Sequence, residues 1–238
     1  MAYQAVFKRY ELKYMITLEQ KQRLLEAMAP YMALDKYGRT VIRNIYFDTP
    51  NYQLIRRSIE KPLYKEKLRI RSYRKVTASS SVFVELKKKY NGVVYKRRLS
   101  MEEKTAMDWI AGLAPPPAGQ IGAEIEYFRN FYPGLHPSVF LSYEREAYYC
   151  REGGDFRVTL DDTILCRQEA LSLEEPVWGT SILPEGYVLM EIKTAGGVPL
   201  WMTQFLTREK IYKTSFSKYG MAYQTMILPQ LQGGYLHV

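Results

Sequence analysis

The sequence has 238 residues, of which 47% are hydrophobic and 14% aromatic, so it is long and apolar enough to form a packed core. Its net charge of +9 indicates an anionic partner, and its two Cys and two His exclude a disulfide framework and a His-based metal cluster. No apolar run approaches the roughly 20 residues of a membrane helix, and the first residues lack the apolar core of a signal peptide. We therefore expect a cytoplasmic protein without a membrane segment.

The first part of the chain alternates short helices and strands. Thr17 and Gln20 have the spacing of a capping box, which predicts that a helix begins there. We interpret Asp48 as the residue that caps a second helix. The elements expected in this part are a strand over Ala5–Ile16, a helix over Leu18–Ala29, a strand over Arg43–Asp48 and a helix over Asn51–Glu60.

Three consecutive strands follow. The polar turn after Lys75 and the Asn91-Gly92 pair are typical hairpin connections, so the three strands form an antiparallel meander. These strands are Tyr64–Lys75, Ser81–Tyr90 and Val93–Ser100.

The rest of the chain adds strands and helices to the same unit. The proline run after Ala114 is interpreted as a loop, because strands on both sides are needed for one sheet, and residues 1–238 are expected to form a single domain. The expected helices are Met101–Gly112, Gly122–Phe131, Pro199–Leu206 and Lys218–Ile227, and the expected strands are Ser138–Arg151, Phe156–Arg167 and Tyr187–Thr194.

Nearly every expected strand has one charged and one apolar face. Residues two apart share a face, so Arg69 and Arg71 lie opposite Leu68 and Ile70. In an ordinary sheet the charged face would meet water. In a closed antiparallel barrel of about eight strands, with helices packed outside, the charged faces would instead point inward. The predicted fold is therefore an α+β barrel that contains a charged tunnel.

Buried cations in such a tunnel would require anions, since an uncompensated buried charge is very costly. A chain of phosphates supplies them, because its oxygens suit both Arg forks and Lys point charges. The carboxylates among the cations would then bind a divalent metal that contacts phosphate oxygens.

Nine segments, taken in order, resemble one known family. They resemble the polyphosphate polymerase (VTC) domain of the triphosphate tunnel metalloenzyme (CYTH-like) superfamily from Phe7 to about Gly220. In this chain they are FKRYELKY, YFDTP, LRIRSYR, VFVELKKK, YKRR, LSYEREAY, FRVTLD, LMEIKT and FSKYG. Two positions depart from the family pattern: Arg9 replaces the first acid of the Glu-x-Glu-x-Lys motif, and Ser215 replaces a frequent Lys.

The resemblance implies a role for each charged residue that matches a motif. It implies that Glu191 is the principal ligand of Mn²⁺ (or Mg²⁺), with Glu11 and Glu85 as supporting acids. The implied catalytic residues, which also bind substrate, are Arg69, Arg71, Lys87, Arg145 and Arg157. The other implied substrate-binding residues are Lys13, Lys96, Arg98, Lys193 and Lys218.

The implied reaction transfers the γ-phosphate of ATP to a growing polyphosphate chain. A tunnel triphosphatase and a non-catalytic protein that binds polyphosphate or another polyanion are the alternatives. No nucleic acid is expected as a partner, and the oligomeric state is open. Some residues also have structural interpretations: Glu191 as a salt-bridge partner of Lys193, and Asp161 as a turn residue instead of a metal ligand. Tyr73 and Tyr143 are interpreted as packing residues, with base stacking as the less favoured alternative.

Overall fold

The structure is a computed structural model that describes residues 10–91 and 93–233. Arg9, Gly92 and the expected beginning of the first strand at Ala5 lie outside the described residues. In the part that is described, no helix is both long and apolar enough to cross a membrane.

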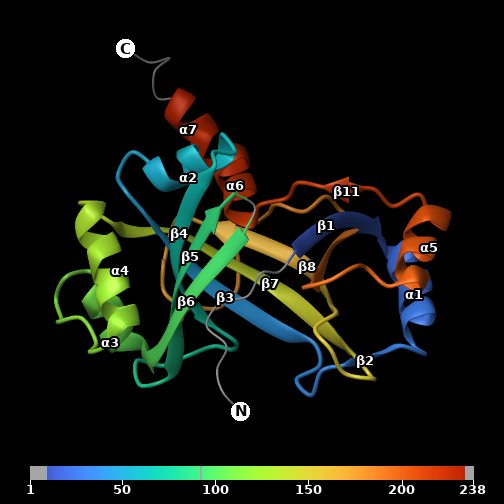
Figure 1. Ribbon diagram of the computed structural model, residues 1–238. Coiled ribbons are helices and arrows are strands. Elements are labelled where there is room, and N and C mark those ends of the chain that lie inside the picture. The colour runs from blue at the N-terminus through green and yellow to red at the C-terminus, as the bar shows by residue number, and fades with distance from the viewer. Residues whose placement is uncertain (1–9, 92, 234–238) are drawn as a thin grey trace.

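The described residues form eleven strands, seven α-helices and one π-helical turn (Figure 1). Eight of the strands have eight or more residues, as expected, and three short ones were not predicted. The strands are β1 (Tyr10–Thr17), β2 (Met32–Leu34), β3 (Thr40–Asp48), β4 (Tyr64–Ser72), β5 (Ser81–Tyr90), β6 (Val93–Glu102), β7 (His136–Cys150), β8 (Arg157–Arg167), β9 (Thr180–Ser181), β10 (Tyr187–Thr194) and β11 (Lys213–Thr214). The helices are α1 (Leu18–Met28), α2 (Gln53–Ile59), α3 (Glu103–Ile110), α4 (Gln120–Phe131), α5 (Leu200–Arg208), α6 (Lys218–Ala222), the π-helix η1 (Tyr223–Ile227) and α7 (Leu228–Gly233).

Local sequence signals account for several of these boundaries. The Thr17 hydroxyl accepts a hydrogen bond from the Gln20 backbone at 3.1 Å, and the Gln20 side chain accepts one from the Thr17 backbone at 3.0 Å. The predicted capping box is therefore confirmed. The expected C-terminal helix begins at Lys218 as predicted, but it changes to a π-helix at Tyr223 and continues as α7 beyond its expected end.

All eleven strands belong to one antiparallel sheet, but the sheet is not closed. Its order is β11-β1-β10-β8-β7-β3-β4-β5-β6, with β2 paired to β7 and β9 paired to β8. The predicted closed barrel is therefore wrong. The physical reason is at the outer edge of β1, where β11 pairs with Lys13 and Tyr14 and so occupies backbone groups that closure with β6 would need.

Helices cover the apolar side of the sheet at its two ends (Figure 1). At one end, Trp109 of α3 and Phe128 of α4 belong to the same buried cluster as Leu68 of β4 and Val84 of β5. At the other end, α1 and α5 bury Leu24 and Phe205 against β1, β8 and β10. Both groups of helices lie outside the sheet, as predicted.

The helix α6 departs from that arrangement. Its Tyr219 stacks on Tyr46 of β3 with ring centroids 4.8 Å apart, and the Tyr46 hydroxyl accepts a hydrogen bond from Arg69. Tyr219 therefore lies on the charged side of the sheet, within a second apolar cluster that includes Tyr143 and Leu189. The expectation that all helices pack outside is wrong for α6, because its apolar side chains find an apolar patch at this end of the charged side.

Candidate functional site

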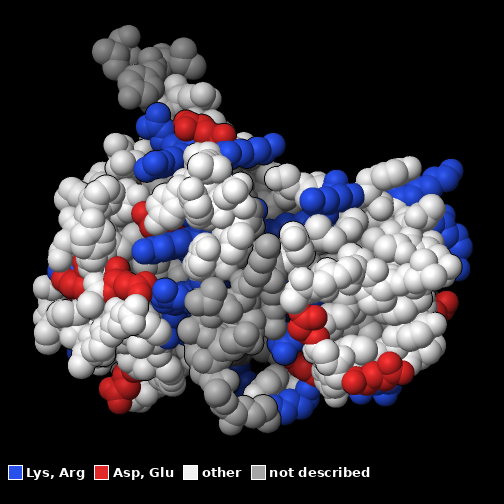
Figure 2. Space-filling view, in the orientation of Figure 1, with Lys and Arg blue, Asp and Glu red and all other residues white. Residues whose placement is uncertain are grey.

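The charged side of the sheet is buried at its centre and partly exposed toward its margins. The apolar neighbours on β4, Leu68 and Ile70, are fully buried on the opposite side, so the predicted alternation of faces is confirmed. On the charged side, Arg71 is 6% exposed, Glu85 1% and Asp161 0%. The alternative of an ordinary sheet with its charges in water is therefore wrong. Figure 2 shows a hollow at the lower centre of the view in which Lys, Arg, Asp and Glu lie together.

Glu85 of β5 gathers four cations, and we call this group the Glu85 cluster. The Glu85 carboxylate accepts hydrogen bonds from Arg69 at 2.8 Å and Arg98 at 2.7 Å, and Lys96 lies 2.6 Å away. Arg71 is more distant at 3.8 Å. Burial opposes the charge on Glu85, but these four cations outweigh it and hold the pKa of its carboxyl far below the usual range.

A second group, the Glu191 cluster, lies on β1, β7, β8, β10 and α6. Its members are Lys13, Arg145, Asp161, Glu191, Lys193 and Lys218. Asp161 accepts two hydrogen bonds from Arg145, both at 2.6 Å, and one from Lys218 at 2.5 Å. Tyr143 connects the two clusters, because its hydroxyl bonds Arg71 at 3.1 Å and its ring lies 4.5 Å from the Lys218 ammonium. It is 2% exposed, which agrees with the packing interpretation.

Glu191 differs in its contacts from Glu85 and Asp161, the other two buried carboxylates of the two clusters. Its nearest cations are Lys193 at 3.3 Å, Lys13 at 3.4 Å, Lys218 at 3.6 Å and Arg145 at 3.8 Å. These distances are longer than the usual 2.7–3.2 Å of a hydrogen bond, so the cations surround the carboxylate without engaging its oxygens directly. Despite its burial, the cations keep the pKa of Glu191 well below the ordinary value.

Like charges face each other across β4 and β5 beyond the Glu85 cluster. Lys67 is opposite Lys87 and Lys65 is opposite Lys89, and we call these four residues the lysine ladder. Such pairs are destabilising unless an anion lies between them. Burial and the neighbouring cations Lys13, Lys65, Lys87 and Arg69 lower the pKa of Lys67 to about 7. Lys67 was not among the predicted ligands, although its place two residues before Arg69 could have identified it.

Two predicted ligands lie at the margin of the site. Lys87 donates a hydrogen bond to Glu11 at 2.9 Å. Burial raises the pKa of the Glu11 carboxyl, but the positive charges of Lys87 and Lys193 outweigh this effect and lower the pKa to about 2. Arg157 is exposed at the beginning of β8, and within the described ranges no ion pair joins it to the two clusters.

Contacts behind the site hold α6 in position. Asp48 accepts hydrogen bonds from the backbone of Leu54 at 2.9 Å and Ile55 at 3.0 Å, so the predicted cap of α2 is confirmed. The same carboxylate accepts a bond from the Tyr219 hydroxyl at 2.9 Å. Because Lys218 directly precedes Tyr219, this contact sets where the Lys218 ammonium meets Asp161.

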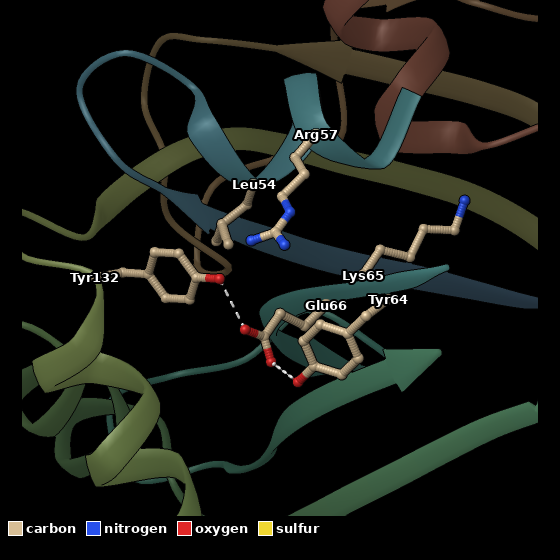
Figure 3. Close-up of a pocket in the computed structure, with 6 residues that line it drawn as sticks. All are labelled: Leu54, Arg57, Tyr64, Lys65, Glu66 and Tyr132. Carbon is tan, nitrogen blue, oxygen red and sulfur yellow. Dashed lines mark hydrogen bonds between the residues drawn. The ribbon is translucent and has the colours of Figure 1, made fainter. Parts of the chain in front are cut away.

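A separate small pocket lies on the other side of β4 (Figure 3). There Glu66 accepts hydrogen bonds from Tyr64 at 2.5 Å and from Tyr132 at 2.8 Å, while Arg57 points toward the pair from α2. Glu66 alternates with Lys65 and Lys67 and so faces away from the charged side. Its contacts join β4 to the end of α4, which is a structural role.

Metal-binding potential is concentrated in one carboxylate. Among the described residues, no group of three or more His, Cys, Asp or Glu side chains could by itself hold a metal ion. Glu85 and Asp161 have oxygens engaged by short bonds to cations. Glu191 has only longer contacts to cations, of 3.3–3.8 Å, so of these three acids it is the one whose oxygens could hold a divalent ion.

Comparisons with known proteins address both the fold and the family. The fold is similar to that of a putative adenylate cyclase from Bacillus halodurans, with a TM-score of 0.57, 16% identity, and coverage of 90% of this chain and 96% of that chain. A putative adenylyl cyclase from Hippeastrum, described as having a dominant triphosphatase activity, matches with a TM-score of 0.52, 18% identity, and coverage of 91% and 94%. No curated protein matches the chain. The model of the VTC domain matches residues 8–227, which confirms the family resemblance of the sequence motifs and shows that this chain belongs to the VTC domain family.

Proposed function

We propose that this protein transfers the γ-phosphoryl group of ATP to the end of a polyphosphate chain held on the charged side of the sheet. The observation that carries the proposal is the excess of cations over carboxylates on this side of the sheet, where several of these charges are buried. Glu11, Glu85, Asp161 and Glu191 share this side with a larger set of cations: Lys13, Lys65, Lys67, Arg69, Arg71, Lys87, Lys96, Arg98, Arg145, Lys193 and Lys218. We call this row of cations the strip. A polyanion would supply the missing negative charge along its whole length.

The lysine ladder supports a chain of phosphates over a single phosphate. Lys67 and Lys87 face each other one strand step beyond the Glu85 cluster, and Lys65 and Lys89 face each other one step further. Residues two apart on a strand are separated by about 6.6–6.8 Å, so the cations repeat along the strip. A linear polyanion matches this repeated arrangement, because each step offers new cations to further phosphate groups.

Phosphoryl transfer relies mainly on alignment and on charge neutralisation. Arg69, Arg71 and Arg145 are predicted to grip the triphosphate with their planar guanidinium groups, and Lys218 to neutralise charge on the transferred group. Arg157, at the exposed end of β8, is proposed to meet phosphates at the rim. A terminal oxygen of the polyphosphate chain attacks the γ-phosphorus, the bond to the β-phosphate breaks and ADP leaves, so the reaction needs no serine or histidine nucleophile.

Glu191, with Glu11 nearby, would hold a divalent ion, Mn²⁺ or Mg²⁺. Such an ion would help to neutralise the charge that develops on the phosphates during transfer. The contacts of Glu85 favour a different role for that residue. Because both of its oxygens are engaged by arginine and lysine, we propose that Glu85 keeps the four cations of its cluster in place before substrate arrives.

Product analysis tests the proposal. The purified protein is incubated with ATP and Mn²⁺, with a parallel sample in chelator, and phosphate products are separated by length on a gel. We expect polymers that require the metal. Orthophosphate alone would support a triphosphatase, and unchanged ATP combined with tight binding of tripolyphosphate would support a non-catalytic binder. Either result would overturn the polymerase.

A further inference from the structure

The chemistry of the charged side changes along β5 and β6. The pair Lys87 and Lys96 is followed by Glu85 and Arg98, and the next pair on the same face is Phe83 and Ser100. The strip therefore passes from cations to an aromatic ring and then to a hydroxyl. This change occurs at the end of the strip that lies away from the lysine ladder.

Three side chains form an ordered group at this end, which we call the aromatic step: Tyr73, Phe83 and Arg98. The Arg98 guanidinium lies over the Phe83 ring, 4.4 Å from its centroid. The Tyr73 and Phe83 rings form a T-shaped pair, with centroids 5.7 Å apart and planes at 83°. Arg98 also donates a hydrogen bond to the Tyr73 hydroxyl at 3.2 Å.

These contacts orient the Tyr73 ring without covering it. Tyr73 packs against Phe83, which agrees with the packing interpretation, yet 39% of the residue stays exposed. Its contact with Phe83 and its hydrogen bond to Arg98 hold the residue in place, while part of it stays accessible to solvent. A planar group could therefore stack on Tyr73 without disturbing its neighbours.

Arg98 joins the aromatic step directly to the Glu85 cluster. The same guanidinium that touches Phe83 and Tyr73 also bonds the Glu85 carboxylate at 2.7 Å. If the phosphates of a ligand bind to the Glu85 cluster, the group attached to these phosphates would lie next to the Tyr73 ring. The ligand class that has phosphates at one end and a flat aromatic group at the other is a nucleotide.

We propose that the aromatic step binds the base of a nucleoside triphosphate, with Tyr73 as the stacking residue and with Phe83 and Arg98 as the residues that orient it. This inference rests on the proposed function, and it gives the substrate a direction: the nucleoside lies at Tyr73 and the phosphates extend toward the lysine ladder. The hydroxyls of Ser81 and Ser100, which are 2.7 Å apart just beyond Phe83, are placed to meet polar groups of the nucleoside.

Stacking on an aromatic ring is tolerant of base identity, because every base has a flat π face. The aromatic step should therefore strengthen the binding of ATP and GTP alike. It should add nothing to the binding of inorganic tripolyphosphate, which has no base. The difference between these probes separates the base site from the phosphate site.

The test is a calorimetric titration of the full chain with ATP, GTP and tripolyphosphate, in parallel for four proteins. These are the wild type, Tyr73→Ala, Tyr73→Phe and Tyr90→Ala. Tyr90 is the matched control, since it is an exposed tyrosine at the other end of β5. Circular dichroism and thermal unfolding show that each variant is folded.

We expect Tyr73→Ala to weaken ATP and GTP binding by between about 5-fold and 100-fold, the range of one base stack, and to leave tripolyphosphate binding unchanged. Tyr73→Phe, which keeps the ring, and Tyr90→Ala should bind like the wild type. An equal loss for tripolyphosphate, or no loss for ATP, would overturn the base site. A wild-type chain that binds ATP through Tyr73 but forms no polymer would overturn the polymerase while the base site stands.

Discussion

Lys87 and Glu11 form an ion pair of 2.9 Å between β5 and β1, although β10, β8, β7, β3 and β4 lie between these two strands in the sheet. The sheet therefore curls until side chains near its two edges meet, without the backbone ladder that would close a barrel. An interior site is created in this way by side-chain contacts across the opening.

Replacing Glu11 by Gln tests how this contact competes with the ligand. Both side chains are partly exposed, at 27% and 38%, so we expect the free energy of unfolding to fall by less than about 1 kcal/mol. Lys87 would then be available to an incoming phosphate, and tripolyphosphate should bind several-fold more tightly. Denaturant unfolding measures the free energy of unfolding, and calorimetric titration measures the affinity for tripolyphosphate. Weaker binding in Glu11→Gln would show instead that the acid supports the ligand.

Glu191→Gln should separate catalysis from phosphate binding. The amide keeps the size of the side chain but removes its charge, and with it the metal assigned to this site. We expect turnover of ATP to be abolished. Tripolyphosphate binding should persist or become tighter, because Lys13, Lys193 and Lys218 lose the acid that neutralises them.

The matched control is Glu152→Gln, in the exposed loop between β7 and β8, which should behave like the wild type. Full activity of Glu191→Gln would remove the metal assignment. Loss of both turnover and binding would show that Glu191 mainly holds the cations in place, as a structural salt-bridge partner.

The strands and their faces could be predicted because their signals are local. The bounds of β5 and β10 agree with the predicted Ser81–Tyr90 and Tyr187–Thr194, and alternation alone placed Arg69 and Arg71 on one side. The ligands that lie together in the Glu85 cluster come from three consecutive strands, so a hairpin pattern already brings them close.

The open edge and the position of α6 could not be predicted in the same way. The strand β11 has two residues, Lys213 and Thr214, and so carries no periodic pattern, yet it occupies the edge of β1. The helical pattern after Lys218 indicates an apolar face but does not say which side of the sheet it covers. Tyr219 reaches the charged side through contacts with Tyr46 and Asp48, which are distant in the sequence.

Lys67 and Lys96 predict a specific dependence of binding on pH. Burial and neighbouring cations lower the pKa of Lys67 to about 7, and the pKa of Lys96 also falls to about 7, although Glu85 acts in the opposite direction. Above pH 7 the free protein therefore holds these amines partly neutral, while a bound polyphosphate favours the charged forms. Affinity for tripolyphosphate should fall as the pH rises from 6.5 to about 8.5, and binding at pH 8 should take up protons.

Calorimetry in two buffers of different ionisation enthalpy measures this proton uptake. The control is the Lys67→Arg, Lys96→Arg double variant, whose guanidinium groups stay charged, so its affinity should depend less on pH than that of the wild type. Tripolyphosphate gains and loses its own protons in the same way with both proteins. The test is therefore the difference between the pH dependences of the two affinities. In the free wild type, the lowered pKa values mean that the unfolded chain binds more protons between pH 7 and 10.5, so its stability should rise over that window. If the affinity for tripolyphosphate depended equally on pH in the wild type and the double variant, the assignment of this dependence to Lys67 and Lys96 would be wrong.

Asp161→Asn tests whether the site depends on an internal anion when no phosphate is bound. Asp161 is fully buried and holds Arg145 and Lys218 through bonds of 2.5–2.6 Å. Removing its charge leaves two cations without their closest counter-charge, so we expect a loss of about 3–5 kcal/mol in the free energy of unfolding, as for a broken buried ion pair. Denaturant unfolding measures this loss.

Tripolyphosphate should recover much of that loss, because phosphate oxygens can replace the carboxylate beside Arg145 and Lys218. The rise in Tm on adding tripolyphosphate should therefore be larger for Asp161→Asn than for the wild type. Asp108→Asn is the control, since that acid pairs with Lys104 on the surface of α3, away from the site, and should change neither quantity appreciably. If ligand raised the Tm of both variants and the wild type by the same amount, Asp161 would be a purely structural partner, and the phosphates would lie away from Arg145 and Lys218.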